Sequence, residues 1–134
     1  MQMQEKVLAR VRSILEHTVK VFKDKEYQKK TWFRHEGPEV SSFIDDIDYF
    51  IGECRKLFKM PNYYEELGRK NGDKLKHLYN MIYQFLGEIE MDIDFSENDF
   101  KEEQLLSDPR WEKIIEASTD VYQVLSEYVG EDVL

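Results

Sequence analysis

Apolar residues recur every three or four positions along most of this 134-residue chain, and this spacing constrains its fold more than any other feature. The pattern predicts four amphipathic helices, over residues 3 to about 29, Gly37-Pro38 to about Lys59, Asp73 to Leu86 or Ile89, and Asp108-Pro109 to Gly130. Glycine and proline are few and aromatic residues make up 13% of the chain, so we expect a packed core rather than disorder. The expected fold is one all-α domain over residues 1–134, a helical bundle of four main helices with one or two short ones.

Short helices are expected in two of the connections. The YYEELGRKNGD stretch predicts a helical turn that ends at Asn71 and Gly72, after which Asp73 caps the third long helix. Ser96 followed by Asp99 resembles the start of a second short helix.

A band of carboxylates interrupted by apolar residues occupies residues 88–103, EIEMDIDFSENDFKEE, where Lys101 is the only cation. Acidic and apolar residues alternate from Glu88 to Phe95, which predicts a short extended segment near 88–95 with the carboxylates on one face. The apolar residues Ile89 and Ile93 also continue the helical stripe of the preceding segment. The pattern therefore leaves strand and helix open for this segment.

Charge is divided unevenly along the chain, whose formal net charge is −9. Residues 1–87 carry 16 lysines and arginines against 13 acidic residues, whereas residues 88–134 carry 3 against 15. A field of this sign attracts basic protein surfaces and repels nucleic acid and anionic lipid. We therefore expect a protein partner, no nucleic acid and no membrane, with an acidic surface that only maintains solubility as the alternative.

A calcium loop is the first chemistry that the acidic band suggests. Asp92, Asp94, Ser96 and Glu103 occupy the first, third, fifth and twelfth places of an EF-hand loop. Glu97, however, replaces the glycine that the sharp turn of such a loop requires. We expect no metal ion at this segment.

Other catalytic and cofactor signatures are missing from the sequence. There is no Glu-x-x-His pair for a di-iron site, no phosphate-binding glycine loop and no nucleophile elbow. The single cysteine, Cys54, falls on an apolar helical face, which predicts a core role and fits a reducing compartment. We expect a protein that is not an enzyme, has no cofactor and, without a signal peptide or membrane-spanning run, is cytoplasmic.

Adjacent tyrosines follow the second helix. Because Tyr63 and Tyr64 cannot both face inward on a helix, at least one should be partly exposed. An exposed tyrosine is a candidate interface anchor, although a structural pair that is half core and half solvent is the more common arrangement.

A small, acidic, all-helical chain without catalytic residues resembles the immunity proteins that accompany bacterial toxins, including colicin and contact-dependent growth-inhibition systems. The stretch from Pro61 to Tyr64 is similar to the tyrosine pair of the colicin DNase immunity proteins, although chain length and flanking sequence differ. The resemblance implies a bacterial protein, a monomer or weak dimer, that neutralises a basic toxin domain, such as a nuclease, through an acidic surface. The expected partner-binding residues are Tyr63, Tyr64, Asp92, Asp94, Glu97, Asp99, Phe100, Glu102 and Glu103.

Two other classes of protein fit parts of the sequence. A small acidic secretion chaperone would hold an unfolded effector segment in an apolar groove. A nucleic-acid-binding regulator would use the basic segment from Lys20 to Arg34, where Trp32 and Phe33 could stack on bases.

Overall fold

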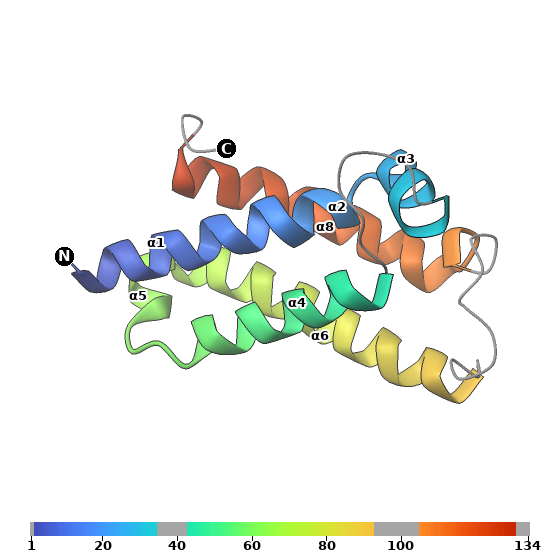
Figure 1. Ribbon diagram of the computed structural model, residues 1–134. Coiled ribbons are helices and arrows are strands. Elements are labelled where there is room, and N and C mark those ends of the chain that lie inside the picture. The colour runs from blue at the N-terminus through green and yellow to red at the C-terminus, as the bar shows by residue number, and fades with distance from the viewer. Residues whose placement is uncertain (1, 35–42, 93–104, 131–134) are drawn as a thin grey trace.

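Four long helices pack as an antiparallel bundle in the computed structural model, which describes residues 2–34, 43–92 and 105–130 (Figure 1). The first helical stretch consists of α1 (Gln2–Ile14), the π-helical η1 (Leu15–Val19) and α2 (Lys20–Phe22), and the other three are α4 (Phe43–Phe58), α6 (Arg69–Asp92) and α8 (Pro109–Val129). The α1 stretch packs against α4 and α8, which also flank α6. The all-α class is confirmed, because no described residue lies in a strand.

Short helices connect the long ones at both ends of the bundle. The pair α3 (Lys25–Gln28) and η2 (Lys29–Phe33) follows α2, and α5 (Tyr63–Leu67) joins α4 to α6. In Figure 1, α3 lies near the start of α8, whereas α5 lies near the start of α1.

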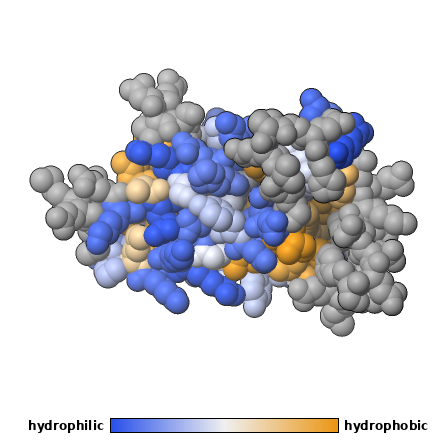
Figure 2. Space-filling model, viewed as in Figure 1, coloured by the Kyte–Doolittle hydropathy of each residue, from blue (hydrophilic) through white to orange (hydrophobic). Residues whose placement is uncertain are grey.

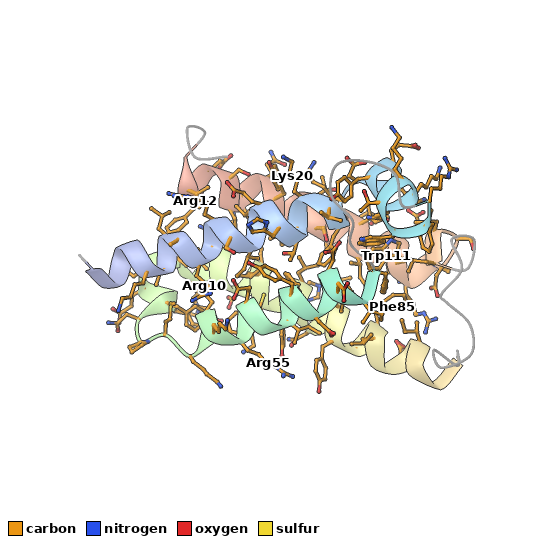
Figure 3. The ribbon with its side chains drawn as sticks, in the orientation of Figure 1. Arg10, Arg12, Lys20, Arg55, Phe85 and Trp111 are labelled. Carbon is orange, nitrogen blue, oxygen red and sulfur yellow. The ribbon has the colours of Figure 1, made fainter. Side chains whose placement is uncertain are left out.

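Aromatic rings fill the end of the core where α4 and α8 begin. The ring of Trp111 lies 6.1 Å from Phe22, 5.8 Å from Trp32, 5.5 Å from Phe43 and 5.7 Å from Phe85, measured between centroids. Figure 3 shows Trp111 and Phe85 close together at this end. Since such contacts add to the burial of large apolar surfaces, Trp111 joins four segments of the chain. Trp111 is fully buried.

The first predicted helix, which was to run to about residue 29, is interrupted at Lys23 and Asp24. The carboxylate of Asp24 accepts a hydrogen bond from the Tyr27 amide at 3.1 Å and so caps α3. The buried side chain of Gln28 folds back and donates to the carbonyls of Val21 and Phe22 at 2.9 and 3.0 Å. These bonds satisfy carbonyls at the end of α2, so the break is stabilised by contacts that hydrophobic spacing does not encode.

The expected start of the third helix at Asp73 is wrong by one turn. Gly68, with φ +92°, ends α5, and α6 begins at Arg69. Asn71 lies within α6, and its side-chain amide donates a hydrogen bond to the Leu67 carbonyl at 3.0 Å. A glycine at the left-handed position therefore ends the short helix earlier than the predicted Asn71-Gly72 pair.

Residues 88–92 are helical, so the extended alternative is wrong for this part of the acidic band. The α6 helix passes through Gly87 and ends at Asp92. Ile89 is fully buried and continues the stripe of Ile82 and Phe85, and burial of that stripe favours the helical period over alternation. Residues 93–95 lie outside the described part of the chain.

The last long helix matches its predicted bounds. Asp108 accepts a hydrogen bond from the Arg110 amide at 2.9 Å, Pro109 occupies the first turn, and Gly130 follows the last residue with φ +88°. Of the second short helix expected after Ser96, the structure describes Leu105 and Leu106, which are helical.

Candidate partner-binding site

The acidic band begins on the last turns of α6. Asp92 is the final residue of that helix, and the other predicted residues of the band lie outside the described part of the chain: Asp94, Glu97, Asp99, Phe100, Glu102 and Glu103. The structure therefore places the start of the band at the end of the bundle where α4 and α8 begin (Figure 1).

Arg110 links the two helices on either side of the band. Its guanidinium contacts the carboxylate of Asp108 at 2.7 Å, that of Glu88 at 3.8 Å, and the ring of Phe85 at 5.2 Å from the centroid. The hydrogen bond from Arg110 lowers the pKa of Asp108. Arg110 thus connects the last turns of α6 with the start of α8.

Two other carboxylates of α8 are paired within the protein. Glu112 forms an ion pair with Lys25 of α3, and Asp120 forms one with Lys74 of α6 at 2.5 Å. These pairs neutralise part of the acidic C-terminal third. By contrast, Glu116 and Glu127 are exposed and form no ion pair with any described residue.

The tyrosine pair divides between core and solvent, as predicted. Tyr63 is 9% exposed and packs against Phe58 at 5.4 Å, whereas Tyr64 is 38% exposed. The Tyr64 hydroxyl donates to Asp73 Oδ1 at 2.6 Å, and this bond raises the pKa of Tyr64 to about 12. A Cβ atom at Gly72 would lie 2.9 Å from the Tyr64 ring, so the ring packs directly on the α6 backbone. The contacts of Tyr64 therefore hold α5 against α6.

The structure does not bring the tyrosine pair together with the acidic band. Most of α6, a helix of 24 residues, separates α5 from the band, which begins on the last turns of that helix. At about 1.5 Å per residue, that helix is about 36 Å long. Figure 1 shows α5 and the end of α6 at opposite ends of the bundle. The predicted partner-binding residues Tyr64 and Asp92 therefore lie at opposite ends of α6.

Two residues of the basic segment from Lys20 to Arg34, Trp32 and Lys29, contact side chains within the protein. Trp32 is 4% exposed, and its indole N–H donates to Asp46 Oδ2 at 2.6 Å. Lys29 lies 3.4 Å from Glu26. Because its indole is buried, Trp32 does not offer the stacking surface on which the nucleic-acid alternative depended.

Sequence patterning missed a cluster of aromatic and cationic side chains between α4 and α6. Arg55 Nε donates to the Tyr79 hydroxyl at 3.0 Å, and its guanidinium lies 5.7 Å from the ring centroid of Tyr83. The two tyrosine rings stack at 6.0 Å, and Tyr83 remains 53% exposed. Tyr79 and Tyr83 are one helical turn apart, and this spacing was the sequence signal that could have indicated their contact.

Metal and thiol chemistry find little support in the described residues. No group of three or more histidine, cysteine or acidic side chains there could hold a metal ion. Cys54 is buried, and burial raises the pKa of its thiol well above the usual value, which disfavours the nucleophilic thiolate. None of the described helices has a stretch long and apolar enough to cross a membrane.

Comparisons of this chain with protein-family models, curated proteins and solved structures found no significant match.

Proposed function

We propose that this protein acts by binding a protein partner, and that the partner presents a basic surface to the acidic band. The observation that carries this proposal is the charge division, with 15 acidic against 3 basic residues from position 88 onward. The proposed partner class is a toxin domain, such as a nuclease, whose substrate groove is basic and can be blocked by carboxylates.

Charges on the described helices support this placement. Asp48 is exposed near the start of α4, and the antiparallel packing puts it at the same end of the bundle as Asp92. The pairs of Glu112 and Asp120 with lysines reduce the net charge along α8.

The physical role of such a surface is to accelerate encounter. Opposite fields on two proteins steer them together, and the effect weakens as salt screens the charges. A few desolvated side chains then determine how long the complex lasts. An immunity protein needs both properties, because it must capture its toxin before the toxin reaches a substrate.

The proposal is tested by capture from an extract of the source cells at low salt, with the wild-type protein and the triple variant Asp92→Lys, Asp94→Lys, Asp99→Lys. We expect the wild type to retain one basic domain in stoichiometric amount. Binding to the wild type should inhibit the activity of that domain. The triple variant should retain much less, because its charge opposes that of the partner.

A matched control reverses three exposed acidic residues elsewhere, Glu65, Glu116 and Glu127, and so makes the same change in net charge. This control should retain the partner at close to the wild-type level. Equal loss with both triple variants would show that net charge, and not the acidic band, drives binding. Recovery of unfolded secreted chains, or of nucleic acid alone, would contradict the proposal.

A further inference from the structure

The outer side of α4 and α6 exposes apolar and aromatic side chains. Ile44 is 36% exposed and Tyr83 is 53% exposed, and both helices face away from α1 and α8 on this side. Figure 2 shows hydrophobic residues gathered between the start of α4 and the second half of α6, and Figure 3 shows Arg55 on the side of the bundle away from α1. Exposed large apolar side chains flanked by charge are typical of interfaces.

Contacts determine which side chains of α4 belong to this surface. Tyr49 and Glu53 bond with side chains of α1 at 2.9 and 2.8 Å, so their side of α4 is covered. Arg55 instead bonds with a tyrosine of α6 at 3.0 Å. Ile44 and Asp48 precede Arg55 on the same helical stripe. We call the surface formed by Ile44, Asp48, Arg55, Lys76, Tyr79 and Tyr83 the α4/α6 face.

The α4/α6 face is acidic at one end and basic at the other. Along α4, Asp48 precedes Arg55 and Lys59, and all three are exposed. Along α6, Lys76 near the start contacts the Phe58 ring at 4.7 Å, whereas the acidic band begins near the end. Because the two helices are antiparallel, like charges gather at the same end.

The charges on the α4/α6 face are arranged approximately symmetrically, with opposite sign, about a point near its middle. Asp48 and Arg55 are seven residues apart, and their midpoint lies beside Gly52. On α6, Lys76 lies seven residues before Tyr83, and the acidic band begins five residues after it. The bond between Arg55 and a tyrosine one turn before Tyr83 puts Gly52 and Tyr83 at about the same level of the bundle, since both helices rise by about 1.5 Å per residue.

Glycines lie within both helices without an internal packing reason. A Cβ atom at Gly52 or at Gly87 would meet nothing within 4 Å. A glycine inside a helix is less favourable than alanine. The absence of a side chain at Gly52 leaves room for a second helix to approach α4 at the centre of the α4/α6 face.

We propose that the α4/α6 face is the interface of a symmetric homodimer, in which α4 lies antiparallel to α4 of a second copy. Asp48 of each copy faces Arg55 of the other, Gly52 lies near the two-fold axis, and the Tyr83 rings meet across it. The charges on the α4/α6 face indicate that its partner is a second copy of the chain. A two-fold axis perpendicular to the helices pairs the acidic end of one copy with the basic end of the other. An axis parallel to the helices would place like charges together.

The first test measures association by sedimentation equilibrium from about 1 to 500 µM protein. We expect the wild type to form dimers that weaken as salt rises from about 50 to 500 mM. Asp48→Arg alone, and Arg55→Asp alone, should each weaken self-association by at least about tenfold, because each creates two like-charge pairs per dimer. An equimolar mixture of the two variants should associate, because every pair in the mixed dimer is again opposite in charge.

Matched controls are Glu116→Arg and Lys20→Asp, which make the same charge changes at exposed positions on other faces. Both should retain wild-type association, and helical circular dichroism should show that all four variants are folded. A wild type that stays monomeric at every concentration overturns the proposal. So does a mixture of the charge variants that fails to associate, or loss of association with the controls.

A second test uses disulfide cross-linking, since the native Cys54 is buried. Gly52→Cys should give a covalent dimer on mild oxidation, because the two copies of this position approach within disulfide range at the axis. Lys20→Cys, on another face, should give little. Equal yields from the two variants would contradict the antiparallel arrangement.

Discussion

Tyr64 and Asp73 form a hydrogen bond between exposed side chains of α5 and α6. Tyr64 is next to Tyr63 in sequence, but the structure uses the two residues differently. Tyr63 is almost fully buried, whereas Tyr64 packs on Gly72 and donates a 2.6 Å hydrogen bond to Asp73. Tyr64, which the sequence suggested as an interface anchor, therefore bonds with Asp73 of its own chain.

Asp73→Asn should lower the pKa of Tyr64 from about 12 toward the ordinary value of 10.0, because the charged acceptor is lost. Folding raises this pKa, so the neutral phenol is favoured in the folded state. The bond's contribution to stability is complete below pH 10 and decreases as pH rises through about 12. An NMR titration of labelled tyrosine rings measures the shift, with Asp48→Asn as the control. A Tyr64 titration unchanged by Asp73→Asn would show that the hydrogen bond does not set its pKa.

At the scale of elements, local signals predicted some helix ends and missed others. The Asp108-Pro109 start and the Gly130 end of α8 are encoded by capping residues, and both were predicted. The break after α2 was missed, because it depends on Gln28 meeting a tryptophan 83 positions away. Alternation at residues 88–92 favoured a strand as much as a helix until burial of Ile89 decided between them.

Gln28→Leu tests the contact that joins α2, α3 and α8. The Gln28 side chain accepts a hydrogen bond from the Trp111 indole at 3.0 Å and donates to two carbonyls of α2. Removing these partners should reduce the free energy of unfolding by about 2–4 kcal/mol, since buried polar groups then lose their hydrogen bonds. Urea denaturation measures the change. The exposed control Gln123→Leu should alter stability by less than about 0.5 kcal/mol. Equal effects of the two substitutions would contradict the role of Gln28.

At the scale of the whole molecule, packing rearranges charge that the sequence presents as a simple division. The acidic band was recognisable from composition, but its distance from Tyr64 was not, because that distance is set by the uninterrupted α6. The Arg55–Tyr83 contact was also hidden, since it joins residues of two helices. Antiparallel packing then aligns the acidic start of α4 with the acidic end of α6. The basic partner proposed for the acidic end of the bundle and the second copy proposed for the α4/α6 face would both contact Asp48.

The most direct test of the proposed function is the association rate of the captured basic domain with the wild type and with the Asp92, Asp94, Asp99 triple lysine variant, measured by stopped flow over a range of salt. The account predicts that the wild-type rate falls as salt rises, and that the variant associates at least about tenfold more slowly at low salt with little salt dependence. Dissociation rates should change less than association rates. Equal association rates and equal salt dependence for the two proteins would contradict binding through the acidic band.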